Sequence, residues 1–490
     1  MDFRKAPKIE LHLHLDCSLS YEVVQQINPE ITLKDYQDNF VGPPKCHDLA
    51  DFLTRAVNGV QLMQSKENLE LVTLDLFQQL QEDGVIYAEI RFAPLLHLEG
   101  GLAPEEVVSI VEEACNQGVA QSGVEAKLIL CTLRHFSEQQ SLETVNLVKQ
   151  FQGSRVVGFD IAADEAGFPI DNHLKAFAFA KTNGIPCTAH AGEAKGPKSV
   201  WETLKQFQVQ RIGHGARSVE DPLLLDHLQE RQIHLELCPT SNVQTNIVDT
   251  LADHPADLIY RHGISMSINT DARTIANINL REEYQHLQNH FDWKASHFFR
   301  CNLEAIAHAF CDESTKIKLR KSLIDFYAAS SALRIRPYED KDLKALVNLV
   351  MTIQNGEFFL GLQPESQKDL VDIPNFFKEG GFWIVEVGET LVACIGLQAL
   401  DQEYAVLRKM FIKKAFRGKP LNIAQLLYQT LEDYAQKKGF SKILLDTPGV
   451  AKAAHRFYER NAFQQIPKTE IPSNYFFIDV QSKVYLKNLR

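Results

Sequence analysis

Residues 9–15 have the sequence IELHLHL, a short run in which apolar and polar residues alternate. Side chains at positions i and i+2 of a strand lie on the same face, so a strand here places His12 and His14 on one side. Seven further apolar runs follow, separated by longer stretches with helical spacing. Strands that alternate with helices predict a parallel sheet, and eight such strands predict a closed (β/α)8 barrel. The other seven runs are VIYAEIRFAP (85–94), KLILCTL (127–133), VVGFDIAA (156–163), PCTAHAG (186–192), RIGHG (211–215), HLELCPTS (234–241) and SMSINTDA (265–272).

The stretches between these runs include three clear helix candidates, at 104–117, 141–152 and 221–232. A long and mostly helical insertion at 21–84 separates the first strand from the second. We expect it above the C-terminal mouth of the barrel, where lids and pocket walls belong.

The sequence changes style near residues 330–340, where a helix-rich stretch ends and SSALRIRPYED follows. The remaining length suits one further domain. We therefore predict two domains, a barrel over 1–332 and a smaller α+β domain over 333–490.

Composition excludes several classes of function. The chain has 490 residues, 45% apolar and 23% charged, which is typical of a soluble globular protein. Its net charge of −12 argues against binding to nucleic acid or to an anionic membrane. The first residues lack the apolar core of a secretory signal, and no run is long and apolar enough to span a membrane. Nine scattered cysteines without a C-x-x-C pair predict reduced thiols and a cytoplasmic location.

Chemically useful side chains gather where the predicted barrel strands end. His12 and His14 lie on the first strand, and the later strands end in HAGE (190–193), GHG (213–215) and NTD (269–271). Active sites of such barrels lie at the C-terminal ends of the strands. A single strand histidine is more often simply packed, but four histidines and an aspartate on four strands favour a metal site.

Three imidazoles and a carboxylate form a donor set that suits Zn²⁺, which lowers the pKa of a bound water toward about 7. We predict one Zn²⁺ per chain, with His12, His14, His190 and Asp271 as its ligands. Glu193 is left for proton transfer, and His214 for orienting the water or stabilising developing charge. Isolated carboxylates such as Asp160 and Asp164 are expected to serve as caps, turns or salt bridges.

The motifs PKIELHLHLD (7–16), HAGE (190–193), RIGHG (211–215), LCPTSN (237–242) and NTD (269–271) resemble those of the adenosine deaminase family of metal-dependent amidohydrolases. The resemblance implies hydrolytic deamination of adenosine or deoxyadenosine, a step of purine salvage. It assigns the zinc ligands, the proton donor Glu193 and the water-assisting His214 to the same positions, with Asp271 also in the catalytic set. It further implies that Asp16 contacts the ribose, and that His14 and Ala163 contribute to substrate binding.

Two departures from the family pattern concern the purine. The family usually has N-T-D-D-P, and its second aspartate holds a ring nitrogen, whereas this chain has NTDAR with Ala272. A bacterial branch with N-T-D-N-R is closer. The family's D-L-A-G-D-E is DIAADE here, so Ala163 keeps a backbone amide but adds a methyl group. Loss of one buried hydrogen bond costs about 0.5–1.5 kcal/mol. Deamination of a different aminopurine is therefore the alternative.

The C-terminal strings LRKMFIKKAFRGK (407–419), KILLDT (442–447) and HRFYERNAF (455–463) resemble the GNAT-type N-acetyltransferase fold. The resemblance implies acetyl-CoA as cofactor, bound partly by backbone amides at a helix N-terminus, with Tyr458 protonating the CoA sulfur. The implied acetyl-CoA contacts are Met410, Ile412, Arg417, Gly418, Lys419, Asn422 and Tyr458. Pro420 and Asn422 replace two family glycines, and proline has no amide hydrogen to donate.

Three hypotheses follow for the whole chain. The first is a zinc-dependent nucleoside deaminase with an appended acetyltransferase-like domain. The second makes acetyl transfer to an unidentified amine the main activity. The third makes the C-terminal domain a non-catalytic module that senses CoA or binds a partner. The sequence does not predict an oligomeric state.

Overall fold

The computed structural model describes residues 2–327, 333–418, 421–472, 474–475 and 482–489. The chain divides into two compact units, Met1–Tyr327 and Ala328–Arg490. The predicted boundary between 332 and 333 adjoins residues 328–332, which lie outside the described residues, and it stays a prediction. Within the described residues, no helix combines the length and the apolar character needed to cross a membrane.

The first unit contains the eight predicted strands, all parallel to their neighbours, in two four-stranded sheets. Single bridges join the sheets at Leu13–Asp271 and Phe159–Cys187, so the strands form a barrel as predicted. The fifth strand is shorter than expected. The strands are β1 (Lys8–His14), β2 (Val85–Phe92), β3 (Glu125–Leu133), β4 (Val156–Ala162), β5 (His190–Ala191), β6 (Arg211–His214), β7 (His234–Leu237) and β8 (Ser265–Ile268).

A charged network lies inside the barrel. Arg91 on β2 binds Asp160 and Glu236, each at 2.7 Å, and Arg211 on β6 binds Glu236 at 2.6 Å and Glu89. All five side chains are buried. Buried charges are tolerated only when they are paired and hydrogen-bonded, so this network fixes where Asp160 and Glu236 point.

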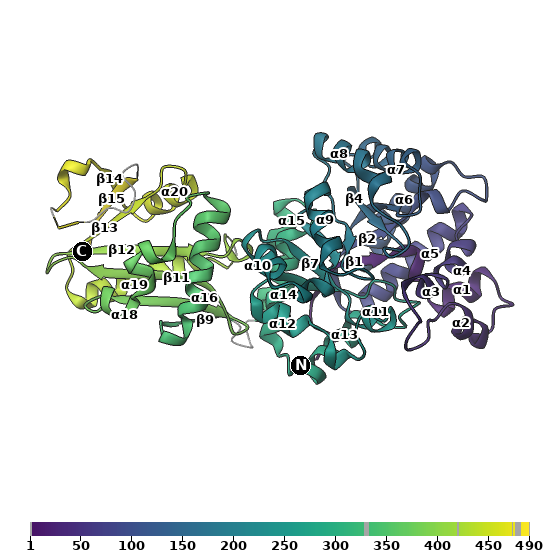
Figure 1. The fold of residues 1–490 in the computed structure, drawn as a ribbon, viewed down its shortest axis with the longest axis horizontal. Helices are drawn as coiled ribbons and strands as arrows, with labels where there is room; N and C mark the ends of the chain where they lie inside the picture. Colours follow the sequence, from purple (N-terminus) through teal and green to yellow (C-terminus); the bar gives the residue numbers. More distant parts are fainter. Residues whose placement is uncertain (1, 328–332, 419–420, 473, 476–481, 490) are drawn as a thin grey trace. The chain divides into compact units, whose positions relative to one another are not determined.

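Helices surround the strands of this unit, as Figure 1 shows. The three predicted helices are present as α6, α7 and α10, with ends shifted by a few residues. The helices that follow β2 are α6 (Pro104–Ser122), α7 (Glu138–Gln150), α8 (Leu174–Thr182), α9 (Pro197–Phe207), α10 (Pro222–Glu230), α11 (Pro239–Gln244), α12 (Ala256–His262), α13 (Leu280–Phe291), α14 (Ala295–His308) and α15 (Glu313–Tyr327).

The insertion between β1 and β2 is helical and covers the mouth of the barrel, as expected. Gly42 N–H donates to the Ile275 carbonyl after β8 at 2.8 Å, and Cys46 N–H donates to the Gln244 carbonyl at the end of α11 at 2.8 Å. Its helices are α1 (Tyr21–Ile27), α2 (Leu33–Asn39), α3 (Leu49–Leu53), α4 (Ala56–Leu62) and α5 (Lys66–Glu82).

In the described residues of the second unit, seven strands form one sheet with the order β14-β15-β13-β12-β11-β10-β9. A turn at Gly388–Glu389 joins β10 to β11 with both residues at positive φ, the geometry of a tight hairpin. The strands are β9 (Leu333–Pro337), β10 (Gly381–Val387), β11 (Thr390–Ala399), β12 (Tyr404–Ile412), β13 (Lys442–Thr447), β14 (Gln464–Ile466) and β15 (Lys483–Asn488). The helices are α16 (Leu343–Met351), α17 (Lys368–Val371), α18 (Ile373–Phe376), α19 (Ile423–Lys438) and α20 (Lys452–Arg460).

Strands β12 and β13 form a parallel pair that separates partway along. Pairing runs from Tyr404–Lys442 to Val406–Leu444 and then ends, although all residues of both strands are described. Lys409, at φ 52, interrupts the regular pairing of β12 with β11. Between these two fully described strands, the ladder pairing of β12 with β13 therefore stops after Val406.

Candidate metal and catalytic site

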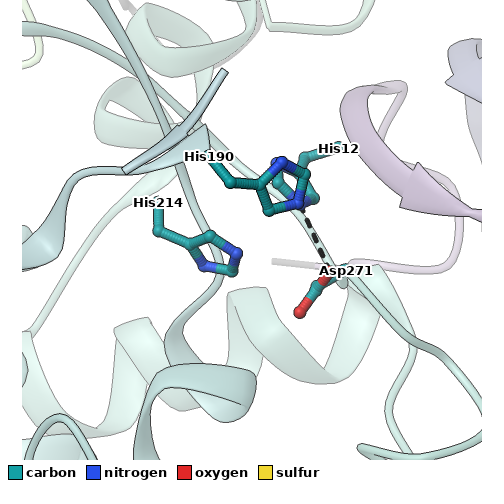
Figure 2. A group of neighbouring side chains, drawn as sticks. All are labelled: His12, His190, His214 and Asp271. Carbon is teal, nitrogen blue, oxygen red and sulfur yellow. Dashed lines mark ion pairs between the residues drawn. The ribbon is translucent and has the colours of Figure 1, made fainter. Parts of the chain in front are cut away.

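Three imidazoles and one carboxylate meet at the C-terminal ends of the barrel strands. His12, His190, His214 and Asp271 each offer one ligand atom, and all four atoms lie within 4.8 Å of one another. Figure 2 shows the side chains turned toward a common space, with the His12–Asp271 ion pair dashed. Its Nε2–Oδ1 distance is 3.2 Å. The group holds three of the four predicted metal ligands, His12, His190 and Asp271, with His214 in place of His14. Its members come from β1, β5, β6 and the segment after β8.

Carboxylates stand behind two of these imidazoles. His12 Nδ1 lies 2.9 Å from Glu236 Oε2, and His190 Nδ1 lies 3.1 Å from Asp160 Oδ2. Each carboxylate accepts the Nδ1 hydrogen, so the Nε2 lone pair is directed into the site. Among the described residues, the buried Nε2 of His12 finds no hydrogen-bond partner of acceptable geometry. A buried nitrogen without a hydrogen bond of good geometry, 3.2 Å from the Asp271 carboxylate, is placed as a metal ligand would be.

His14 contributes a fourth imidazole to the same space. Its Nε2 lies 3.2 Å from His190 Nε2 and 3.5 Å from Asp271 Oδ1. Asp16 follows β1 directly, and its carboxylate accepts from the Ala93 N–H at 3.3 Å. Burial raises the pKa of Asp16 to about 6, and burial lowers the pKa values of His14 and His190. These two imidazoles are therefore neutral and able to bind a cation.

Asp271 occupies a strained position that fixes its carboxylate. Its φ of 65° is unusual for a residue other than glycine, and the Ser241 hydroxyl donates to its Oδ2 at 2.7 Å. Its backbone is held because Asp271 N–H donates to the His12 carbonyl at 3.1 Å and its own carbonyl accepts from His14 N–H at 2.8 Å. Burial opposes ionisation, but His12 and His214 keep the pKa of Asp271 well below its usual range.

Glu193 lies beside His214, with 3.5 Å between its Oε2 and the imidazole Nε2. The side chain is buried, and burial together with the nearby Asp271 raises the pKa of Glu193 well above its usual value. A carboxyl group that keeps its proton near neutral pH can act as an acid.

A second glutamate, which sequence reasoning did not single out, holds the segment that carries Glu193. Both oxygens of Glu165 accept from backbone N–H groups: Gly192 at 2.8 Å, Glu193 at 3.0 Å and Lys195 at 2.7 Å. The Ser199 hydroxyl donates a fourth hydrogen bond, at 2.5 Å. The Glu165 side chain is almost fully buried. It therefore orients the proton-donor loop without entering the reaction space.

A hollow of about 600 Å³ leads from Glu193 to the surface. Mouth loops and insertion residues line it, among them Asp164, Arg217 and His47. Ala272 packs in an adjoining apolar cluster with Cys46 and Ile275, so no polar group stands at this position. Ala163 has φ 77, which is left-handed backbone that favours glycine. The alanine therefore keeps the backbone shape of the family's glycine.

The sequence did not mark the partners that stand behind the imidazoles. Asp160 forms the salt bridge expected of it, with Arg91, and also contacts His190. Asp164 accepts from the Ala166 and Gly167 N–H groups, which is the turn role expected of it. Glu236 follows a regular strand pattern, and only its place on β7, two strands from β1 around the barrel, could have identified it.

In the second unit, the structure brings Met410 and Tyr458 together across the opening between β12 and β13. The Tyr458 hydroxyl lies 3.8 Å from the Met410 sulfur, and burial raises the pKa of this tyrosine. Ile412 ends β12, and its carbonyl accepts from Arg417 Nε at 2.6 Å.

The loop that precedes α19 contains the other predicted CoA contacts. The Arg417 guanidinium binds Glu357 at 2.7 and 2.8 Å, so its charge is already paired. Gly418 has φ 82 and Asn422 φ 50, so the asparagine adopts the left-handed backbone that glycine usually supplies. The predicted contact Lys419, with Pro420, lies outside the described residues.

The adenosine deaminase family model matches residues 7–326. The adenosine deaminase of Clostridium acetobutylicum is 36% identical over 324 residues, which span 65% of this chain and 97% of that protein. This chain belongs to the adenosine deaminase family. The adenosine deaminase of Enterococcus faecalis is also 36% identical, over 66% of this chain and 98% of that protein.

Comparison with solved structures gives the same family of folds. The adenine deaminase of Arthrobacter aurescens is similar with a TM-score of 0.62 and 25% identity, covering 66% of this chain and 99% of that one. The acetyltransferase (GNAT) family model matches residues 347–463. The first unit is thus a hydrolase of the adenosine deaminase family with a cluster of side chains that could bind a metal. An acetyltransferase-like module follows it in the chain.

Proposed function

We propose that the first unit deaminates adenosine or deoxyadenosine hydrolytically, releasing ammonia and leaving a 6-oxopurine nucleoside. The observation that carries this proposal is the convergence of His12, His190, His214 and Asp271 at the barrel mouth, with a buried acid beside them. The names of the relatives from Clostridium acetobutylicum and Enterococcus faecalis support adenosine as the substrate.

The donor set fits one zinc ion per chain. We assign His12, His14, His190 and Asp271 as its ligands, because nitrogen and carboxylate donors at four positions suit Zn²⁺. His12 Nε2, which makes no hydrogen bond of good geometry among the described residues, and the carboxylates behind His12 and His190 support this assignment. When bound, zinc supplies Lewis-acid activation of the attacking water.

The remaining groups of the site handle protons and position the substrate. Glu193, whose pKa burial raises well above its usual value, delivers its proton to the ring nitrogen next to the carbon that bears the amino group. His214 assists the attacking water through Nε2, the ring nitrogen that lies 3.5 Å from Glu193 Oε2. Asp16 is assigned to the ribose, and the amide of Ala163 to the purine, as the family motifs imply.

A different aminopurine is the second candidate substrate. The apolar cluster around Ala272 removes a polar partner for the base, and the similar structure from Arthrobacter aurescens is named an adenine deaminase. A panel of adenosine, deoxyadenosine, adenine, AMP and N6-methylated forms, followed by loss of the amino-purine absorbance, separates these substrates. Fast turnover of adenine with none of adenosine would refute the nucleoside assignment.

For the second unit, we propose acetyl-CoA binding in the opening between β12 and β13. The end of the β12–β13 pairing at Val406–Leu444 and the nearby Tyr458 support this position. The acceptor amine is not identified, and a binding module without catalysis is the alternative. Calorimetric titration of acetyl-CoA into the full chain tests both the catalytic domain and the CoA-binding module. If acetyl-CoA does not bind, the second unit can only serve to dock another partner. A cytoplasmic location stays a prediction.

A further inference from the structure

His214 lies at the end of a hydrogen-bond chain that begins at a backbone amide. The Ala256 N–H, at the start of α12, donates to His254 Nδ1 at 3.2 Å. A backbone N–H can only donate, so His254 Nδ1 carries no hydrogen. Burial lowers the pKa of His254 to about 3, which keeps this ring neutral, and its hydrogen is therefore on Nε2.

The orientation of the next side chain follows from this hydrogen. His254 Nε2 lies 3.1 Å from Asn242 Oδ1, which accepts its hydrogen. A flipped amide would set two donors against each other, so Asn242 has one orientation. Its Nδ2 then donates to His214 Nδ1 at 3.0 Å. Because all three side chains are buried, water does not compete for these contacts.

The consequence is that neutral His214 has its hydrogen on Nε2, the atom 3.5 Å from Glu193. His12 and His190 have the opposite arrangement, since carboxylates accept their Nδ1 hydrogens and leave Nε2 lone pairs toward the site. An imidazole with hydrogen on Nε2 can donate there but cannot ligate a metal through that atom. The three imidazoles whose ligand atoms lie within 4.8 Å of one another therefore differ in tautomer. The partner of each Nδ1 atom, a carboxylate or the Asn242 amide, sets the difference.

We propose that Asn242 and His254 are positioning residues that hold the His214 hydrogen on Nε2, so that His214 donates into the reaction space instead of binding the metal. The kinetic part of this proposal rests on the proposed deamination. The tautomer itself does not, and it can be measured separately.

The direct test is nitrogen NMR of the full chain labelled with ¹⁵N-histidine, in zinc-free and zinc-loaded protein. A His214→Ala variant identifies the signals of His214. We expect a pyridine-type Nδ1 and a protonated Nε2 in both states, with Nε2 unshifted by zinc. A protonated Nδ1, or a zinc-induced shift of Nε2 like those of the ligand histidines, would overturn the proposal whatever the substrate is.

Asn242→Asp reverses the polarity of the chain with almost no change of shape. The carboxylate accepts from His214 Nδ1, so the Nε2 donor is lost. Loss of a donor aimed at developing charge lowers kcat by about 100-fold. We expect KM to change less than about threefold and the metal content to stay near one per chain. An unchanged kcat in folded Asn242→Asp protein would contradict the proposal.

Asn302→Asp is the matched control for this charge change. Asn302 is equally buried, but it binds the Ile9 N–H at the opposite end of β1, at 2.7 Å. We expect its kcat to stay within about twofold of wild type.

His254 is tested by a pair of variants. His254→Phe removes the donor that orients Asn242, and His254→Gln restores an N–H. We expect about a 10-fold lower kcat for the first and recovery to within about threefold for the second. Equal kcat values for both variants would overturn the role of His254.

Discussion

Glu165→Gln tests how strongly a buried carboxylate fixes the proton-donor loop. Glu165 accepts the N–H groups of Gly192, Glu193 and Lys195 and the Ser199 hydroxyl. A glutamine of the same shape has one oxygen and one NH₂ group. Its oxygen can keep the bonds to Glu193 and Lys195, and Ser199 can rotate to accept. The Gly192 N–H then faces another donor.

The size of the effect follows from this count. One charge-assisted hydrogen bond is lost outright, and the two bonds that remain become neutral. Hydrogen bonds to charged groups contribute about 1.5–3 kcal/mol each, so we expect the barrel unit to lose about 2–4 kcal/mol. Displacement of Glu193 by a fraction of an ångström should lower kcat by about 10- to 100-fold.

The assay combines thermal or chemical unfolding, with the transition of the first unit resolved, and steady-state ammonia release. Glu202→Gln, on the exposed side of α9, is the matched control and should change neither quantity. The reasoning is refuted if Glu165→Gln has wild-type stability and wild-type kcat. A stability loss without any loss of kcat would limit Glu165 to a structural role.

Four further variants test separate parts of the site. Glu193→Gln should abolish turnover while zinc stays near one per chain by metal analysis, and zinc loss would make Glu193 a ligand. Asp271→Ala should empty the metal site, and retained stoichiometric zinc would remove it from the ligand set. Ala163→Gly relieves left-handed strain of about 1 kcal/mol, so denaturation should show unchanged or slightly higher stability, unlike most changes to glycine. Burial raises the pKa of Glu283 to about 8 from 4.5, so its protonated form stabilises the fold at low pH and this contribution is lost as pH rises to 8. Between pH 4.5 and pH 8, the free energy of unfolding of Glu283→Gln should therefore rise by roughly 3–5 kcal/mol relative to that of the wild type. A difference that does not change with pH would show that the Glu283 carboxyl group is not the cause.

Much of the barrel could be predicted because its signals are local. Alternating runs mark strands, and histidines at their ends mark the mouth. In the second unit, the string KILLDT, one of those that carry the resemblance to the acetyltransferase fold, forms the whole of β13, from Lys442 to Thr447. Strand β5 has only two residues, His190 and Ala191. Before it, Pro186 and Thr188 bind the Phe159 backbone through two separate hydrogen bonds, which no sequence periodicity predicts.

The supporting partners of the site could not be predicted in the same way. The contacts in question join residues that are distant in sequence. Glu165 binds Glu193, 28 positions away, Glu236 binds His12, 224 positions away, and His254 binds Asn242, 12 positions away. Each is one polar residue in an ordinary context, and its role appears only when the strands are placed side by side. Tautomers depend on such partners, so the sequence could assign roles to the four imidazoles but not the nitrogen of each ring that carries the hydrogen.

The most direct test is ammonia release from adenosine by full-length protein that is first stripped of metal and then titrated with Zn²⁺. The account predicts loss of activity on chelation and full recovery at one zinc per chain, with no further gain beyond it. Full activity after exhaustive chelation, or none in protein holding one zinc per chain, would contradict it.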